Sequence, residues 1–359
     1  MSYRTIALLT TFILTTQALA HDEEENSSSW SNSFFTALFT PFKTSKKVVN
    51  DTIDCSYDYS EQSTASSLRF CGADRLVYRG LTPRDGEAYT SSQGYAKTVD
   101  LLCLDNVHLT GQWLKVNNHG PTMLLCHGNG MVSQDYSHWA HWFAHHNVNT
   151  LAFTIRGYPG SEGSSKEIAR TSPLDIEAAL RFLVKDQKIS FDRIGVYGFS
   201  LGGGYATYAM RYFNLPGILQ NTLPSVGDVI RNVTTTWLPE TLANGIARSH
   251  LDNHAGKIEE ENLGLFATLG MKEIPLNSFN NKDNLSQTKA PVMFIYGEND
   301  QLMGKEQGAM QLYQGRYGKT AEVDPSLFVK ITHGGHTDVF FQQPQAEKAV
   351  ENFLEKIFK

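Results

Sequence analysis

The sequence is poor in cysteine, has no long apolar run and carries no excess of basic residues. Four cysteines among 359 residues are too few for a disulfide framework, and no C-x-x-C or zinc-ligand spacing is present. No apolar run reaches the roughly 18–20 residues that a membrane-spanning helix needs. The net charge of −6 argues against a nucleic-acid partner, because proteins that bind nucleic acids usually carry a basic face. The balance of 41% hydrophobic and 19% charged residues is instead that of an ordinary globular protein.

The first 20 residues have the order of a secretory signal peptide. Arg4 precedes an apolar, threonine-rich centre over residues 6–16, and the sequence A-L-A at 18–20 provides an A-x-A cleavage site. We therefore expect residues 1–20 to be removed and the protein to be exported, either secreted or kept in the periplasm or envelope. An apolar first helix or an uncleaved anchor is the alternative.

Residues 21–74 form a low-complexity leader rich in Ser, Asn and Thr, and the main domain follows over 75–359. In an exported protein we expect Cys55 and Cys71 to form a disulfide, because both lie before the main domain. Cys126 ends an apolar stretch and is expected to be a buried free thiol.

Segments typical of strands and helices alternate along the main domain, which predicts an α/β fold with a mostly parallel sheet and helices on both faces. Pro173 follows Ser172 at an expected helix start, where the missing N–H of proline costs nothing. Residues 226–288 interrupt the alternation, hold no obvious strand and are interpreted as a small lid insertion. The expected strands are 99–104, 108–116, 121–126, 148–154, 193–198, 216–221, 291–296 and 326–331, and the expected helices are 133–146, 173–187, 201–213, 305–316 and 342–358.

A serine lies in the tightest turn of the sequence. The segment G-F-S-L-G at 198–202 fits G-x-S-x-G and joins an expected strand to an expected helix. In this pattern the turn holds a nucleophilic serine outward, and the glycines leave room where side chains would collide. Ser200 is therefore the candidate nucleophile, and an ordinary helix-capping serine is the alternative.

A serine hydroxyl needs a positioned base, and the base needs an orienting acid. Two later strands end in such residues, because Glu298 and Asp300 follow the strand 291–296 and His333 and His336 follow the strand 326–331. The carboxyl ends of parallel strands meet at one crevice of an open sheet, so these side chains are expected to converge on Ser200. The residues alone leave open which acid and which histidine are used.

Acyl transfer also needs two hydrogen-bond donors for the developing oxyanion. The strand 121–126 runs into H-G-N-G at 127–130, whose glycines let backbone N–H groups face a substrate. We assign one donor to the N–H of Asn129 and the other to the N–H of Leu201. His127 is interpreted as a structural hydrogen-bonding residue, and a second base is the alternative.

Together these segments resemble the α/β-hydrolase-fold serine hydrolases of the HGN type with no cap or a small lid. The resemblance covers residues 95–359 apart from the lid and is carried by LLCHGNG, FTIRGYPGSEG, GVYGFSLGGG, PVMFIYGENDQL and ITHGGHTD. It implies Ser200 as nucleophile, Asp300 as acid and His336 as base. It also implies that the loop of Arg156 and Tyr158 lies near the mouth of the site. No cofactor or metal is expected.

The expected function is hydrolysis of carboxylic esters or thioesters through an acyl-enzyme on Ser200. The substrate would be a small-molecule or lipid-like acyl compound, with the lid against its acyl group. A serine peptidase of the same fold is one alternative, and a non-catalytic binding protein that retains the fold is another.

Three histidines, His138, His141 and His145, fall on one stripe of the expected helix 133–146. We interpret them as a solvated face beside an apolar stripe that contains two tryptophans. A metal site is the alternative, although no H-E-x-x-H pattern occurs there.

Overall fold

The computed structural model describes residues 90–91, 94–118, 120–165, 168–225 and 279–359, together with 228, 257–258, 265 and 274–275. The expected signal peptide, the leader and the Cys55–Cys71 pair lie outside the described residues. Within the described part, no helix is long and apolar enough to cross a membrane.

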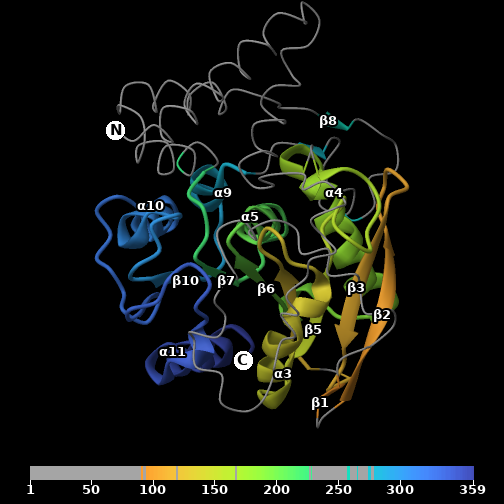
Figure 1. Cartoon of the computed structure of the whole chain (residues 1–359), viewed down its shortest axis with the longest axis horizontal. Helices are drawn as coiled ribbons and strands as arrows, with labels where there is room; N and C mark the ends of the chain where they lie inside the picture. The colour runs from red at the N-terminus through yellow and green to blue at the C-terminus, as the bar shows by residue number, and fades with distance from the viewer. Residues whose placement is uncertain are drawn as a thin grey trace, which may run out of the picture.

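A nine-stranded sheet forms the centre of the described domain, with the order β1-β2-β3-β5-β4-β6-β7-β10-β11 (Figure 1). β3 pairs antiparallel with β2 and with β5, whereas all neighbours from β5 to β11 are parallel. The mostly parallel sheet is therefore confirmed, and every expected strand occurs in it. The strands are β1 (Thr90–Ser91), β2 (Gly94–Leu102), β3 (His108–Leu114), β4 (Thr122–Cys126), β5 (Asn149–Phe153), β6 (Ile194–Phe199), β7 (Gly217–Gln220), β10 (Val292–Gly297) and β11 (Phe328–Ile331).

Helices cover both faces of the sheet (Figure 1). Every residue of β4, β5, β6 and β10 is buried, because a parallel sheet covered on both faces leaves no side of these strands exposed. Cys126, at the end of β4, is a buried free thiol as predicted. One face carries α4 (Ile168–Arg181), α5 (Gly202–Phe213), α9 (Asn281–Ser286) and α10 (Lys305–Tyr317), and the other carries α3 (Ser137–His145) and α11 (Pro344–Ile357).

The expected helix start at Pro173 is wrong. α4 already includes Ile168, so Pro173 lies inside the helix, which continues into a π-helical turn over Phe182–Asp186. An internal proline costs about 3 kcal/mol, because it removes a backbone hydrogen bond and crowds the preceding turn. Every residue from Thr171 to Leu180 is buried. Packing of this helix between the sheet and its neighbours therefore outweighs the local preference of proline.

The described pieces of the expected insertion include structure that the sequence did not indicate. β8 (Lys257–Ile258) and β9 (Ile274–Pro275) form a short antiparallel pair, whereas no strand was expected over 226–288. Strands of two residues are too short to show an alternating pattern. The last part of the segment forms α9, which packs on α5, where Thr207 Oγ1 donates to Asn281 Oδ1 at 2.7 Å. These final residues therefore belong to the helical layer of the main domain.

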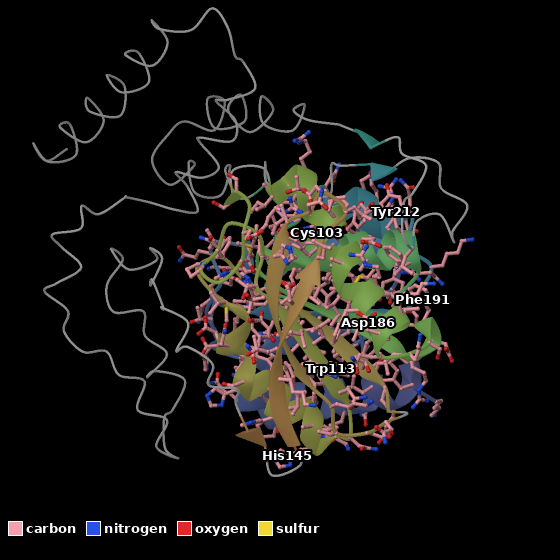
Figure 2. The ribbon with its side chains drawn as sticks, turned by 90° about the vertical axis from the view of Figure 1, so that its right-hand side faces the viewer. Cys103, Trp113, His145, Asp186, Phe191 and Tyr212 are labelled. Carbon is pink, nitrogen blue, oxygen red and sulfur yellow. The ribbon has the colours of Figure 1, made fainter. Side chains whose placement is uncertain are left out.

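α3 buries its aromatic residues, as predicted, but exposes only two of the three histidines of its stripe. Both tryptophans of the helix and Phe143 are buried, whereas His138 and His145 are exposed and His141 is half-buried. Figure 2 shows His145 at one end of the molecule. Over the described ranges, no group of three His, Cys, Asp or Glu residues is arranged to hold a metal ion.

A buried ion pair fixes the loop after β5 to α4 and to the turn between β2 and β3. Arg156 donates from Nε to Asp175 Oδ1 at 2.7 Å and from Nη1 to Asp105 Oδ2 at 2.7 Å. Asp175 is fully buried and also accepts from the Cys103 thiol at 3.6 Å and from the Tyr205 hydroxyl at 3.4 Å. Charges at this depth persist only when they are paired and hydrogen-bonded. The Arg156 side chain therefore points into the core, whereas Tyr158 of the same loop contacts Asn129 after β4.

Replacing Arg156 with Met is expected to lower the free energy of unfolding by about 3–5 kcal/mol, because Asp175 stays buried without its counter-charge. Urea unfolding followed by circular dichroism measures this loss. Lys348→Met is the matched control, since it breaks an ion pair in which the lysine side chain is 65% exposed, and it should leave stability almost unchanged. Equal stability of the Arg156 variant and the wild type would contradict the structural role of the pair.

Candidate active site

Ser200 occupies the turn between β6 and α5 with its backbone in the left-handed region, at φ 52°. β6 ends at Phe199 and α5 begins at Gly202, so strand and helix are joined by two residues. The Ser200 N–H donates to Gln220 O of β7 at 3.1 Å, which ties the turn to the neighbouring strand. A left-handed non-glycine residue costs about 1–3 kcal/mol and persists only where the surrounding structure holds it.

Close packing explains the glycines on either side of Ser200. A Cβ on Gly198 would lie 2.6 Å from Ala206 Cβ, and one on Gly202 would lie 2.0 Å from the carbonyl oxygen of Cys126. Both distances are far shorter than van der Waals contact, so a side chain at either position would force α5 away from β4 and β6. The spacing G-x-S-x-G is therefore a packing requirement of this turn.

The three side chains implied by the resemblance form one chain of hydrogen bonds. His336 Nε2 lies 2.9 Å from Ser200 Oγ, and His336 Nδ1 lies 2.8 Å from Asp300 Oδ2. The other carboxylate oxygen of Asp300 accepts from the Met303 N–H at 3.1 Å, which orients the carboxylate. Asp300 is 2% exposed and Ser200 is 4% exposed. With Nδ1 donating to the carboxylate, Nε2 is the nitrogen that accepts a proton from the serine.

The competing acid and histidine lie outside this chain of hydrogen bonds. Glu298 accepts from the His333 N–H at 2.9 Å and from Lys330 Nζ at 3.0 Å, and these two bonds lower the pKa of its carboxyl group. The His333 side chain is 88% exposed. Glu298 therefore holds the loop after β11 through the His333 backbone, whereas His336 contacts the serine and Asp300 contacts His336.

The loop after β4 lies against the serine turn, as expected for an oxyanion site. A Cβ on Gly128 would lie 2.7 Å from the Phe199 ring and 3.4 Å from Ser200 Cβ. The N–H of Leu201 lies at the N-terminus of α5, where backbone N–H groups lack partners within the helix. Of the two oxyanion donors expected from the sequence, Leu201 directly follows Ser200 in the chain. Asn129 follows Gly128, which packs against Ser200.

Two further contacts at the site involve Tyr158, whose loop was expected near the mouth of the site, and Asn221, for which no role was expected. The Tyr158 hydroxyl donates to Asn129 Oδ1 and so fixes the Asn129 side chain in the loop after β4. Asn221 Nδ2 donates to the backbone oxygen of His336 at 2.7 Å. A lone asparagine after a strand has no periodicity or spacing that could have identified Asn221.

The alpha/beta hydrolase family profile matches residues 123–349, more than half of the chain. The chain belongs to this family.

Three curated proteins are similar to this chain at low identity. The uncharacterized protein YfhR of Salmonella typhi is 25% identical over 182 residues, which are 46% of this chain and 61% of that protein. Protein bem46 of Schizosaccharomyces pombe is 28% identical over 59% of this chain and 61% of its own length. The alpha/beta hydrolase domain-containing protein WAV2 of Arabidopsis thaliana is 25% identical over 79% of this chain and 87% of its own length. The chain thus spans only 61% of the length of the first two relatives.

Solved structures share the fold of this chain. An esterase of Pyrococcus furiosus has a TM-score of 0.52 at 22% identity and covers 74% of this chain and 91% of the esterase. An alpha/beta hydrolase of Penicillium sp. sh18 has a TM-score of 0.50 at 18% identity and covers 73% of this chain and 97% of that protein. Identities at this level establish the fold alone.

His127 is a neutral structural residue. Its Nε2 accepts from the Ile155 N–H at 2.9 Å, and its Nδ1 donates to Gly128 O at 2.8 Å. These partners fix the tautomer, because an amide N–H only donates and a carbonyl only accepts. Burial lowers the pKa of His127 to about 4. A second base would need a free ring nitrogen, which His127 lacks, so its role is to hold the loop after β4 against the loop after β5.

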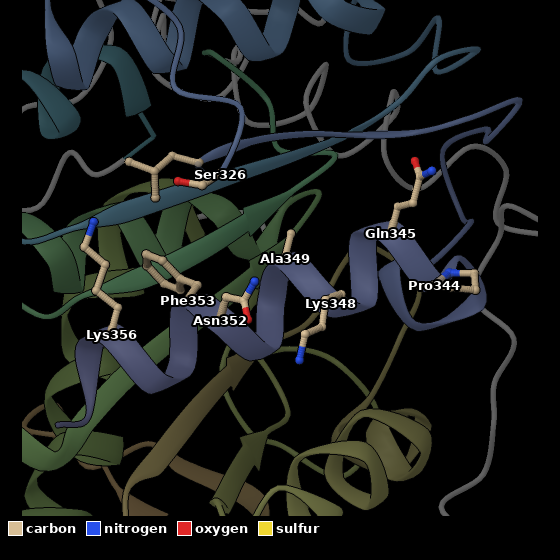
Figure 3. A pocket seen from close by; sticks show the side chains of 9 residues that line it. Ser326, Pro344, Gln345, Lys348, Ala349, Asn352, Phe353 and Lys356 are labelled. Carbon is tan, nitrogen blue, oxygen red and sulfur yellow. The ribbon is translucent and has the colours of Figure 1, made fainter.

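A groove of about 580 Å³ lies between α11 and the chain that leads into β11 (Figure 3). It is lined by Ser326, Leu327 and residues of α11 from Pro344 to Lys356. Ser326 and Leu327 precede β11, whereas the candidate catalytic side chains follow the carboxyl ends of their strands. None of the lining residues belongs to the candidate site, so the groove is separate from it.

Acid is expected to destabilise the protein through His127. The pKa of about 4 in the folded protein lies below the value of about 6.5 in an unfolded chain, so the unfolded state binds more protons between these pH values. The free energy of unfolding should therefore fall by about 2 kcal/mol through this residue between about pH 7 and about pH 5. Urea unfolding over this range for the wild type and His127→Gln measures the difference. Parallel curves for the two proteins would contradict the expectation.

Proposed function

We propose that the protein is a serine hydrolase that cleaves carboxylic esters or thioesters through an acyl-enzyme on Ser200. The observation that carries this proposal is the chain of hydrogen bonds from Ser200 to His336 at 2.9 Å and from His336 to Asp300 at 2.8 Å. A hydroxyl, an imidazole and a buried carboxylate in this order activate a serine as a nucleophile. Membership of the alpha/beta hydrolase family supports the same reaction class.

In the acylation step Ser200 Oγ attacks the carbonyl carbon of the substrate while its proton passes to His336 Nε2. Asp300 stabilises the imidazolium that forms, and the N–H groups of Asn129 and Leu201 donate to the oxyanion of the tetrahedral intermediate. When the intermediate collapses, the bond to the alcohol or thiol breaks, and the leaving group takes the proton from His336. The acyl group remains on Ser200 as an ester.

Deacylation repeats these transfers with water as the nucleophile. His336 takes a proton from the water as its oxygen attacks the acyl carbon, and the same two N–H groups bind the second oxyanion. Collapse breaks the bond to Ser200 Oγ, which receives the proton from His336. The free acid leaves, and the starting state is restored.

The proposal includes an acyl compound, small or lipid-like, whose chain lies against the insertion over 226–288. Apolar residues such as Trp237, Leu263 and Phe266 in that segment support it. It also includes export of the protein after removal of residues 1–20, which rests on the signal-peptide pattern of the sequence.

Replacing Ser200 with Ala is expected to lower turnover of a p-nitrophenyl ester by a factor on the order of a million, because the three residues act as a unit. A fluorophosphonate probe should label the wild type and leave the variant unlabelled, since the probe reacts with an activated serine alone. Circular dichroism serves as the control for folding. A parallel peptide panel separates ester hydrolysis from peptidase activity, and cleavage of peptides alone would overturn the assignment to esters.

Replacing His336 with Ala is expected to cost a loss of similar order, because Ser200 then has no base. The chain provides a matched control in His333→Ala, which removes a histidine from the same loop without touching the serine. The control should retain nearly the wild-type kcat. If His333→Ala lost most of its kcat while His336→Ala kept nearly the wild-type kcat, the base would be His333 and not His336.

A further inference from the structure

The strand β7 lies between the strand that carries the nucleophile and the strand that carries the acid. In the sheet order β6-β7-β10-β11, Ser200 follows β6, Asp300 follows β10 and His336 follows β11. β7 contributes no member of the candidate triad, but Asn221 directly follows it, at the same edge of the sheet. Asn221 is 2% exposed, so its amide is placed among the loops of the site.

The Asn221 side chain joins the acid-bearing strand to the histidine-bearing loop. Its Oδ1 accepts from the Gly297 N–H, at the end of β10, at 2.7 Å. Its Nδ2 donates to His336 O at 2.7 Å and to Gly335 O at 3.3 Å. The orientation of the amide is fixed by these partners, because the Gly297 N–H only donates and the carbonyl oxygens only accept.

The Asn221 backbone adds a third connection to the same strand. Its N–H donates to Ile295 O of β10 at 2.9 Å, and its φ of 46° lies in the left-handed region, which asparagine adopts more readily than most residues. The turn after β7 therefore presents the amide between β10 and the loop after β11 in one fixed orientation.

Such a link matters because His336 must satisfy two short contacts at once. Nδ1 has to stay within 2.8 Å of Asp300 and Nε2 within 2.9 Å of Ser200, although the two partners come from different strands. A displacement of about 1 Å in such an arrangement can lower the rate about 100-fold. Through its two side-chain hydrogen bonds, Asn221 fixes the distance between the His336 backbone and the end of β10, and it contacts no reacting atom.

We propose that Asn221 is a positioning residue that holds His336 in register with Asp300 and Ser200; this inference rests on the proposed function of Ser200 as nucleophile. The loop has other anchors, because Gln220 Nε2 donates to Asp338 O at 2.7 Å and the Asn299 N–H donates to Gly334 O at 2.8 Å. Loss of the Asn221 amide therefore leaves the loop attached and changes the placement of the imidazole.

The test uses Asn221→Gly in the full-length protein, because glycine removes the amide and adopts a positive φ without strain. We expect kcat for a short p-nitrophenyl ester to fall about 10- to 100-fold with KM changed by less than about two-fold, since the amide touches no substrate. Labelling by a fluorophosphonate should slow in parallel with kcat. Asn221→Asp keeps an acceptor for the Gly297 N–H but repels the two carbonyl oxygens, and its kcat should fall at least as far.

Asn149→Ala is the matched control. Asn149 is also fully buried, and its side chain accepts from the Val116 N–H at 2.8 Å and donates to Asn117 O at 2.8 Å. It lies at the start of β5, at the opposite end of the sheet from Ser200. The control should lose thermal stability while its kcat stays within about two-fold of the wild type, because no triad contact depends on it.

Wild-type kcat in Asn221→Gly or in Asn221→Asp would overturn the positioning role. So would an equal loss of kcat in Asn149→Ala, because the effect would then follow general stability. Failure of both Asn221 variants to fold would assign the residue to stability and overturn the proposal as well. An unlabelled wild type would refute the nucleophile assignment, whereas a labelled wild type with an equally fast Asn221→Gly variant would refute the positioning role alone.

Discussion

Directly after the left-handed Ser200, α5 approaches the strand ends more closely than any side chain would allow. A Cβ on Gly202 would lie 2.0 Å from a carbonyl oxygen of β4, and one on Gly203 would lie 2.1 Å from the Thr222 side chain. The absence of side chains at these two positions sets the start of α5 directly on the sheet. This contact between helix and sheet brings Ser200 next to the loop after β4, and the His336 ring lies within hydrogen-bond distance of the Ser200 hydroxyl.

Buried polar side chains fix the loops that surround this turn. His127 holds the loop after β4 through both ring nitrogens. Arg156 holds the loop after β5 through the carboxylates of Asp175 and Asp105. Asn221 joins β10 to the loop of His336. Each of these groups has hydrogen-bond partners that offset the cost of removing it from water. Loops at the carboxyl edge of a parallel sheet have few regular backbone bonds of their own. Their geometry here is set by single side chains that reach across from neighbouring elements.

The pattern of the sequence was enough to locate the sheet and the serine turn. Central strands such as β4 and β6 are buried on both faces, so they read as continuous apolar runs, and the glycines around Ser200 mark a turn that only small residues permit. The helix around Pro173 was misplaced because a local rule about proline was outweighed by burial of the whole helix. The buried ion pair of Arg156 could not be predicted from a local pattern, because its partner Asp175 lies on α4.

By itself, the sequence determined the α/β class, the strand positions and a short set of candidate residues that included Ser200. Those features are local, since periodicity and glycine spacing depend on neighbours within a few positions. Only the tertiary structure brought Asp300 and His336 to the serine while leaving Glu298 and His333 on the surface of the same two loops. Glu298 lies two positions from Asp300, and His333 lies three positions from His336. A local sequence pattern therefore does not predict which residue of each pair contacts the site. Which one reaches Ser200 depends on how each loop leaves its strand and on what Asn221 holds in place, and both are decided by packing between distant segments.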